Sequence, residues 1–230
     1  MQNIILTTKK IFKLAFILIL ITANFMSCKT APAKEETLID LIKAGKSEEL
    51  QERLNSSAIN MKDEEGNSLL HIAAVKNNPI IVRLLINMDA DIEAKNDTGA
   101  TPLAAALNNS AYDAVKVLVE YNANIFAKDN EGEKPFDTAC KNNVPNLILT
   151  AQTIKQKDEN QDTALHLAAK AMDKQLTEQI LAIAPPETAY NKENLSPLGI
   201  AYNRNDVEDS AEIASILLLA GIQPMGKDFA

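Results

Sequence analysis

The chain has 230 residues, of which 31 are Asp or Glu, 23 are Lys or Arg, and 46% are apolar. The net charge of −8 and the pI near 4.9 argue against a nucleic-acid partner, because phosphates require a basic face. Two cysteines exclude a disulfide scaffold and a zinc ribbon. The apolar content is ample for a packed core.

The first 27 residues have the pattern of a secretory signal. Lys9, Lys10 and Lys13 precede an apolar run over residues 14–23, and the segment contains no acidic residue. This run is shorter than the roughly 20 residues that span a bilayer, and a basic start followed by a short apolar stretch is typical of a signal peptide. Export is therefore expected.

The end of this signal resembles that of bacterial lipoproteins, in which the residue after the cut is a lipidated cysteine. Ser27 and Cys28 match this site. The resemblance implies a lipid on Cys28 and attachment to a membrane of the bacterial cell envelope. Cleavage that releases a soluble secreted protein and retention as an uncleaved anchor remain alternatives. Residues 28–37 then comprise the lipidated cysteine and a small, polar stretch that we expect to be a flexible tether.

The rest of the chain repeats with a period of 33 residues. Gly66, Gly99 and Gly132 are each 33 residues apart, and each is followed two residues later by a similar segment. The similar segments begin at Ser68 (SLLHIAA), Thr101 (TPLAAAL), Lys134 (KPFDTAC), Thr163 (TALHLAA) and Ser196 (SPLGIAY). They resemble the ankyrin repeat, whose signature is Thr-Pro-Leu-His-x-Ala on this period.

This resemblance implies an all-α ankyrin-repeat solenoid of about six helix–turn–helix units. Residues 38–62 are expected to form a degenerate N-terminal capping repeat, and residues 63–230 five repeats. The expected repeat starts are Asp63, Asn96, Asp129, Asp158 and Asn191. Because one such unit cannot bury its faces alone, the array should form a single domain.

The repeated positions have a physical meaning of their own. Large hydrophobic residues recur at Leu70, Leu103, Phe136, Leu165 and Leu198, and alanine recurs at Ala73, Ala106, Ala139, Ala168 and Ala201. An alanine in every unit indicates close approach of two backbones inside the stack. Ser and Thr residues that suit helix N-caps precede prolines that suit the first helical turn. Asn77, Asn143 and Asn205 stand where a left-handed residue ends the helix.

Two units depart from the period. The third is four residues short, and its second helix is predicted over residues 146–154, almost directly before the next start. The fifth has about four extra residues, which we expect in a longer loop over residues 203–210.

Few residues suggest chemistry. The sequence has no phosphate-binding glycine loop, nucleophile elbow or metal-binding motif. His71 and His166 occupy the fourth place of the repeat signature, where the resemblance implies hydrogen bonds to the nearby hydroxyl and backbone. Cys140 stands where other units have alanine, so it is interpreted as a small buried hydrophobic residue. Glu64 and Glu65 fall in an exposed turn without an apolar pocket that would shift a pKa. We therefore expect no catalytic residue, cofactor, metal or small-molecule substrate.

The surface is the remaining candidate. In ankyrin-like proteins, partners dock against the turn tips and the inner face of the first helices. The predicted acidic tip residues are Glu64, Glu65, Asp97, Glu131, Glu133, Glu159, Asp162 and Glu193, and the predicted basic row is Lys76, Lys141, Lys170 and Arg204. This arrangement favours a protein partner of mixed or basic charge.

The sequence therefore predicts a lipid-tethered, non-catalytic protein-interaction module. A structural or host-facing surface protein without a specific partner is the first alternative, and an enzyme is the second.

Overall fold

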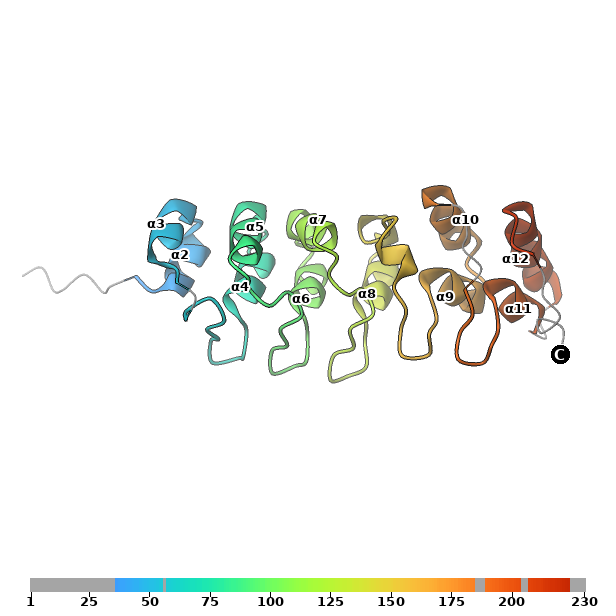
Figure 1. The fold of residues 1–230 in the computed structure, drawn as a ribbon, viewed down its shortest axis with the longest axis horizontal. Helices are drawn as coiled ribbons and strands as arrows, with labels where there is room; N and C mark the ends of the chain where they lie inside the picture. The colour runs from blue at the N-terminus through green and yellow to red at the C-terminus, as the bar shows by residue number, and fades with distance from the viewer. Residues whose placement is uncertain (1–35, 56, 185–188, 204–206, 224–230) are drawn as a thin grey trace, which may run out of the picture. The chain divides into compact units, whose positions relative to one another are not determined.

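The computed structural model describes residues 36–55, 57–184, 189–203 and 207–223. The predicted signal, Cys28 and nearly all of the tether lie outside these residues. Within them the chain forms eleven α-helices, two short 3₁₀ turns and no β-strand, which confirms the predicted all-α class (Figure 1). No described helix has the length and the apolar composition needed to cross a bilayer.

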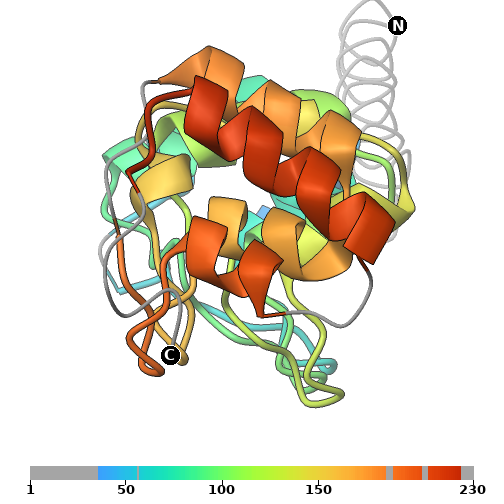
Figure 2. The ribbon, with the colours of Figure 1, turned by 90° about the vertical axis from the view of Figure 1, so that its right-hand side faces the viewer.

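The helices come in consecutive pairs. They are α2 (Leu38–Ala44) with α3 (Ser47–Arg53), α4 (Leu69–Val75) with α5 (Pro79–Asn87), α6 (Pro102–Asn108) with α7 (Tyr112–Glu120), α9 (Ala164–Ala171) with α10 (Lys174–Ile183), and α11 (Pro197–Tyr202) with α12 (Val207–Leu219). Helix α8 (Pro135–Lys141) is followed instead by the 3₁₀ turns η1 (Pro145–Leu147) and η2 (Thr153–Lys155). First helices pack on first helices and second helices on second helices, which gives two layers with the turns projecting from one side (Figure 2).

The predicted hydrophobic columns form the core between these layers. Leu70, Leu103 and Leu198 are fully buried, and Phe136 packs against Phe126 with ring centroids 5.6 Å apart. The recurring alanines are all fully buried as well. Burying a leucine or phenylalanine side chain contributes about 1.5–3 kcal/mol, so each unit depends on the next to cover its apolar face.

The helix ends follow the predicted capping pattern in most units. The side-chain oxygens of Ser68, Thr101 and Ser196 accept hydrogen bonds from backbone N–H groups in the first turn. Pro102, Pro135 and Pro197 each occupy the first helical position. Helix α8 is different, because its N-cap is Lys134, which makes no side-chain cap.

The predicted left-handed caps are confirmed at Asn77 and Asn143, with φ angles of 51° and 58°. The third, Asn205, lies outside the described residues. Ser110 and Met172 adopt the same left-handed conformation at the corresponding positions of their units.

The second helix predicted over residues 146–154 is wrong. This segment forms η1 and η2 instead, and its threonine hydroxyls bond to the nearby backbone. The backbone N–H of Thr150 donates to Thr153 Oγ1 at 2.8 Å, and Thr153 Oγ1 donates to the carbonyl of Ile148 at 2.6 Å. Such local bonds compete with a helical ladder, and the four missing residues leave no length for a full helix.

The longer loop predicted over residues 203–210 is also wrong in its extent. Helix α12 begins at Val207 and runs for 13 residues, whereas α5 and α7 have nine each. The extra residues of the fifth unit therefore lengthen its second helix as well as the connection.

The turn tips contain a left-handed residue in every repeat. Gly66, Gly99 and Gly132 have positive φ angles, and the corresponding positions of the fourth and fifth repeats hold Gln161 and Asn194, with φ of 63° and 64°. Glycine adopts this conformation without steric cost, whereas a residue with a Cβ adopts it only with steric strain.

We predict that Gln161→Gly stabilises the fold by about 0.5–1 kcal/mol, because relief of the left-handed strain exceeds the added chain entropy. Gln161 is exposed, so little packing is lost. Urea denaturation measures the effect. Gln161→Ala is the control and should give no gain; an equal gain in both variants would contradict the prediction.

Candidate functional site

His71 has a structural position inside the stack. Its Nδ1 lies 2.8 Å from Ser68 Oγ, and its Nε2 donates to the carbonyl of Ala100 in the next repeat at 2.9 Å. Because a carbonyl only accepts, Nε2 carries the proton and Nδ1 accepts. The side chain is fully buried. His71 therefore joins two repeats and has no access to a substrate.

His166 occupies the same position in the fourth repeat and makes the same contacts. Its Nδ1 lies 2.8 Å from Thr163 Oγ1, and its Nε2 donates to the carbonyl of Leu195 at 3.2 Å. Burial lowers the pKa of both histidines. Both rings are thus held neutral, as expected of residues that link repeats.

The other chemical candidates occupy the core edge or the exposed turn. Cys140 is half-buried against the core, and burial raises the pKa of its thiol to about 11, so it carries little thiolate. Glu64 and Glu65 are exposed on the tip of their turn. Among the described residues, no group of three or more His, Cys, Asp or Glu side chains could hold a metal ion.

The structure places most of the predicted acidic tip residues on the surface. Glu64, Glu65, Asp97, Glu131, Glu159 and Glu193 are exposed. Asp162 is a correction, because it is fully buried and accepts a hydrogen bond from Asn191 Nδ2 at 2.9 Å. Glu133 is half-buried and accepts from Thr138 Oγ1 at 2.9 Å. These two carboxylates are parts of the fold rather than of an open fringe.

The predicted basic row is also changed by these contacts. Lys141 forms an ion pair with Glu133 at 3.0 Å, which lowers the pKa of the Glu133 carboxyl, and Lys170 forms one with Asp162. Lys76 is exposed but lies one position further along its repeat than the other two lysines do. Arg204 lies outside the described residues. Two of the four predicted basic residues, Lys141 and Lys170, are therefore paired with acids from the turns of their own repeats.

A second row of lysines was not predicted. Lys62 Nζ donates to the carbonyl of Lys95 at 2.8 Å, and Lys95 Nζ donates to the carbonyl of Lys128 at 2.6 Å. Lys62, Lys95 and Lys128 each stand directly before a repeat start. This 33-residue spacing in the sequence could have revealed the row. Carbonyl partners leave the charges of Lys62 and Lys95 in place beside the acidic tips.

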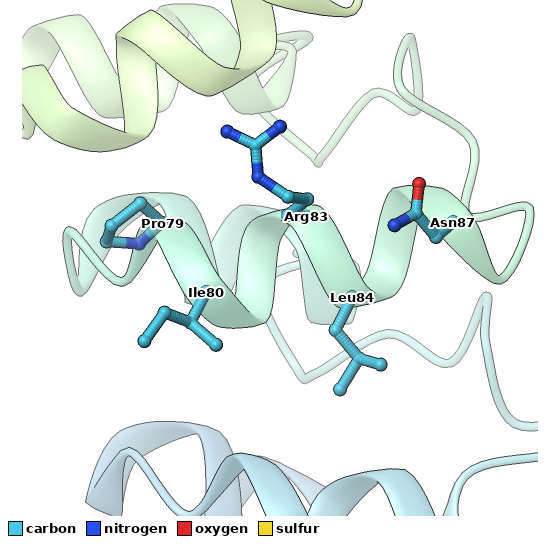
Figure 3. Close-up of a pocket in the computed structure, with 5 residues that line it drawn as sticks. All are labelled: Pro79, Ile80, Arg83, Leu84 and Asn87. Atoms are coloured by element: carbon cyan, nitrogen blue, oxygen red, sulfur yellow. The ribbon is translucent and has the colours of Figure 1, made fainter.

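A shallow hollow of about 450 Å³ is lined by residues of α5. Its residues are Pro79, Ile80, Arg83, Leu84 and Asn87. Ile80, which is 68% exposed, extends with Leu84 from the side of α5 opposite Arg83 (Figure 3). Arg83 is bound to Glu120 at 2.9 Å and thereby lowers the pKa of that carboxyl. The hollow offers apolar contact but no nucleophile or general base.

Comparison with known proteins identifies the repeated unit. Residues 38–129 match the family model of ankyrin repeats (3 copies). The chain contains ankyrin repeats. Over 60 residues it is 37% identical to the poly [ADP-ribose] polymerase tankyrase of Caenorhabditis elegans, a match that spans 26% of this chain and 3% of that protein.

Two solved structures are similar in fold. The ankyrin repeat domain of Bcl-3, a member of the IκB family, has 23% identity and a TM-score of 0.54, with 79% of this chain and 81% of that chain covered. A chain in the complex of the predatory endopeptidase Bd0816 of Bdellovibrio bacteriovorus with immunity protein Bd3460 has 24% identity and a TM-score of 0.48, with 77% and 96% covered. The ankyrin fold and its repeats indicate a protein–protein interaction module.

We predict that the two neutral histidines make stability depend on pH. Their pKa values lie below the unfolded value of about 6.5. The stabilisation is therefore fully present above about pH 6.5 and is lost as the pH falls below it, since the unfolded chain binds protons that the folded chain does not.

Urea denaturation at pH 7.5 and pH 5.0 checks this prediction. The double variant His71→Gln, His166→Gln should be less stable at pH 7.5 and should show a smaller fall between the two pH values. An identical fall in the variant and the original protein would contradict it.

Proposed function

We propose that this chain is a lipid-tethered ankyrin-repeat protein that binds a protein partner at the surface of a bacterial membrane and catalyses no reaction. The proposal rests on the row of exposed acidic residues at the turn tips of an ankyrin array. His71 and His166 of this array are buried and hydrogen-bonded, and Cys140 packs against the core. The tether is inferred from the signal pattern that ends at Cys28.

The charges of the tips suggest the kind of partner. Glu64, Glu65 and Glu131 are exposed, and no ion pair neutralises them among the described residues. Glu159 is different, because it is paired with Lys128. Exposed charges of one sign at regular spacing steer a complementary partner and act mainly on its association rate. A segment with basic residues fits this surface best.

We predict that Cys28 carries the lipid. Metabolic labelling with a fatty-acid analogue should mark the original protein and the Cys140→Ala variant but not the Cys28→Ala variant. Since one acyl chain binds a membrane only marginally, stable anchoring requires more than one. Equal labelling of the Cys28→Ala variant would contradict lipidation at this residue.

We also predict that partner binding depends on the tips. Residues 29–230 of the original protein, used as bait, should capture a protein that the triple variant Glu64→Lys, Glu65→Lys, Glu131→Lys binds more weakly at low ionic strength. Individual exposed charges contribute only about 0.2–1 kcal/mol, so the triple variant is the appropriate test.

The matched control changes the same charge elsewhere. Glu48, Glu52 and Glu178 are exposed on the second helices α3 and α10, and their triple reversal to Lys should leave capture unchanged. If this control loses the partner while the tip variant keeps it, the proposed surface is wrong. A captured protein that neither variant releases would also contradict binding at the tips.

A further inference from the structure

Backbone hydrogen bonds connect the tips of adjacent repeats, except at one joint. The N–H of Asp97 donates to the carbonyl of Glu65 at 3.2 Å, and that of Asn130 donates to Thr98 at 2.9 Å. Lys192 donates to Asn160 in the same way at 2.8 Å. These bonds join the first repeat to the second, the second to the third, and the fourth to the fifth. Among the described residues, no corresponding bond joins the third repeat to the fourth.

The tip glycines show the same interruption. A Cβ placed on Gly66 would lie 2.3 Å from Asp97 Oδ1, and one on Gly99 would lie 2.4 Å from Asn130 Oδ1. These distances show that the first three tips press directly against one another. A Cβ on Gly132 would meet no atom within 4 Å. The tip of the third repeat therefore stands away from the tip of the fourth.

Both helix layers are also interrupted at this joint. Helices α4, α6 and α8 pack closely in sequence, as do α9 and α11, but α8 and α9 do not. In the second layer, η1 packs on α7 and α8, whereas η2 packs on α9 (Figure 1). The third repeat has Asp137 at the position of His71 and His166, so, like the second repeat with Ala104, it makes no histidine bond to the next unit.

Side-chain contacts take the place of these connections. Lys134 Nζ lies 2.9 Å from Asp158 Oδ2, and the two side chains are only 12% and 1% exposed. Lys128, directly before the third repeat, pairs with Glu159 of the fourth on the surface. A buried ion pair stays closed because separating its members without water is strongly unfavourable.

We propose that the joint between the third and fourth repeats is a hinge and that the Lys134–Asp158 pair holds it closed. When the pair opens, the described residues of 38–149 and those of 158–222 move as two blocks. The angle between the two blocks can then change at this joint, and the inner surface of the array changes its curvature with it. A protein partner that contacts both blocks would select one angle between them. This inference does not depend on the lipid at Cys28.

Asp158→Asn is the conservative way to open the pair. Asp158 Oδ1 accepts from the backbone of Asn160 and Asp162, and Asn96 and Asn191 make the same turn bonds at the corresponding positions. Asparagine therefore keeps the turn and removes only the charge.

Lys134→Thr is an independent second variant, because Thr101 and Thr163 occupy this position in other repeats. Asp129→Asn is the matched control: Asp129 makes the same turn bonds and has no ion pair among the described residues.

Distances between spin labels measure the hinge directly. In the full chain, solubilised in detergent and carrying Cys28→Ser and Cys140→Ala, one label pair at residues 116 and 175 crosses the joint. Pairs at residues 51 and 116 and at residues 175 and 215 lie within the two blocks. All four positions are exposed. Double electron–electron resonance then gives a distance distribution for each pair.

We expect the distribution across the joint to be narrow in the original protein and in Asp129→Asn, and to broaden or shift in Asp158→Asn and Lys134→Thr. The two pairs within the blocks should not change. Equal distributions across the joint in all four proteins, whether narrow or broad, would overturn the proposal. Broadening of all three pairs together would overturn it too, because it would show loosening of the whole array rather than a hinge.

Discussion

The structure depends on contacts that each repeat makes with the next. Its first helices have six to eight residues, and isolated helices shorter than about 12–15 residues are marginal in water. They persist here because the buried alanines let neighbouring helices approach and because backbone groups of one unit bond to the next. His71 shows the principle most clearly, since one buried ring caps its own helix and binds the carbonyl of Ala100 in the following repeat.

The same dependence governs the surface. Lys170 and Asp162 form an ion pair, and Asp162 also binds Asn191 of the following repeat. Charged side chains that hold neighbouring repeats together are not free to meet a partner. What remains for recognition is the set of exposed tip acids without an ion pair among the described residues, such as Glu64, Glu65 and Glu131. The surface proposed for partner binding is therefore narrower than the charge pattern of the sequence.

The fold could be predicted from the sequence because its rules act within one repeat. A hydroxyl before a proline caps a helix, and a recurring alanine marks a close approach, whatever the neighbouring units are. The contacts between repeats could not be predicted in this way. The burial of Asp162 depends on Asn191, which lies 29 residues away. The failure of the helix over residues 146–154 depends on Thr150 and Thr153 bonding locally in a unit that is too short.

The shortened third repeat also shows why a regular sequence pattern does not ensure a regular array. Position by position, this unit keeps its buried Phe136 and Ala139. Lys134 replaces the capping hydroxyl, and Asp137 replaces the linking histidine. Lys134 removes a cap inside the repeat, Asp137 provides no histidine bond to the next unit, and among the described residues no backbone bond joins this tip to the tip of the fourth repeat. The buried pair of Lys134 and Asp158 compensates with a contact that depends on charge.

The central claim is that contact between neighbouring repeats, and not any single repeat, sets local stability. Native-state hydrogen exchange of backbone amides at increasing denaturant tests it most directly. The amides of α4 and α6 should open with one common free energy, those of α9 and α11 with another, and the residues between η1 and η2 with the lowest. A single opening free energy for all four helices, or an independent value for each, would contradict the claim.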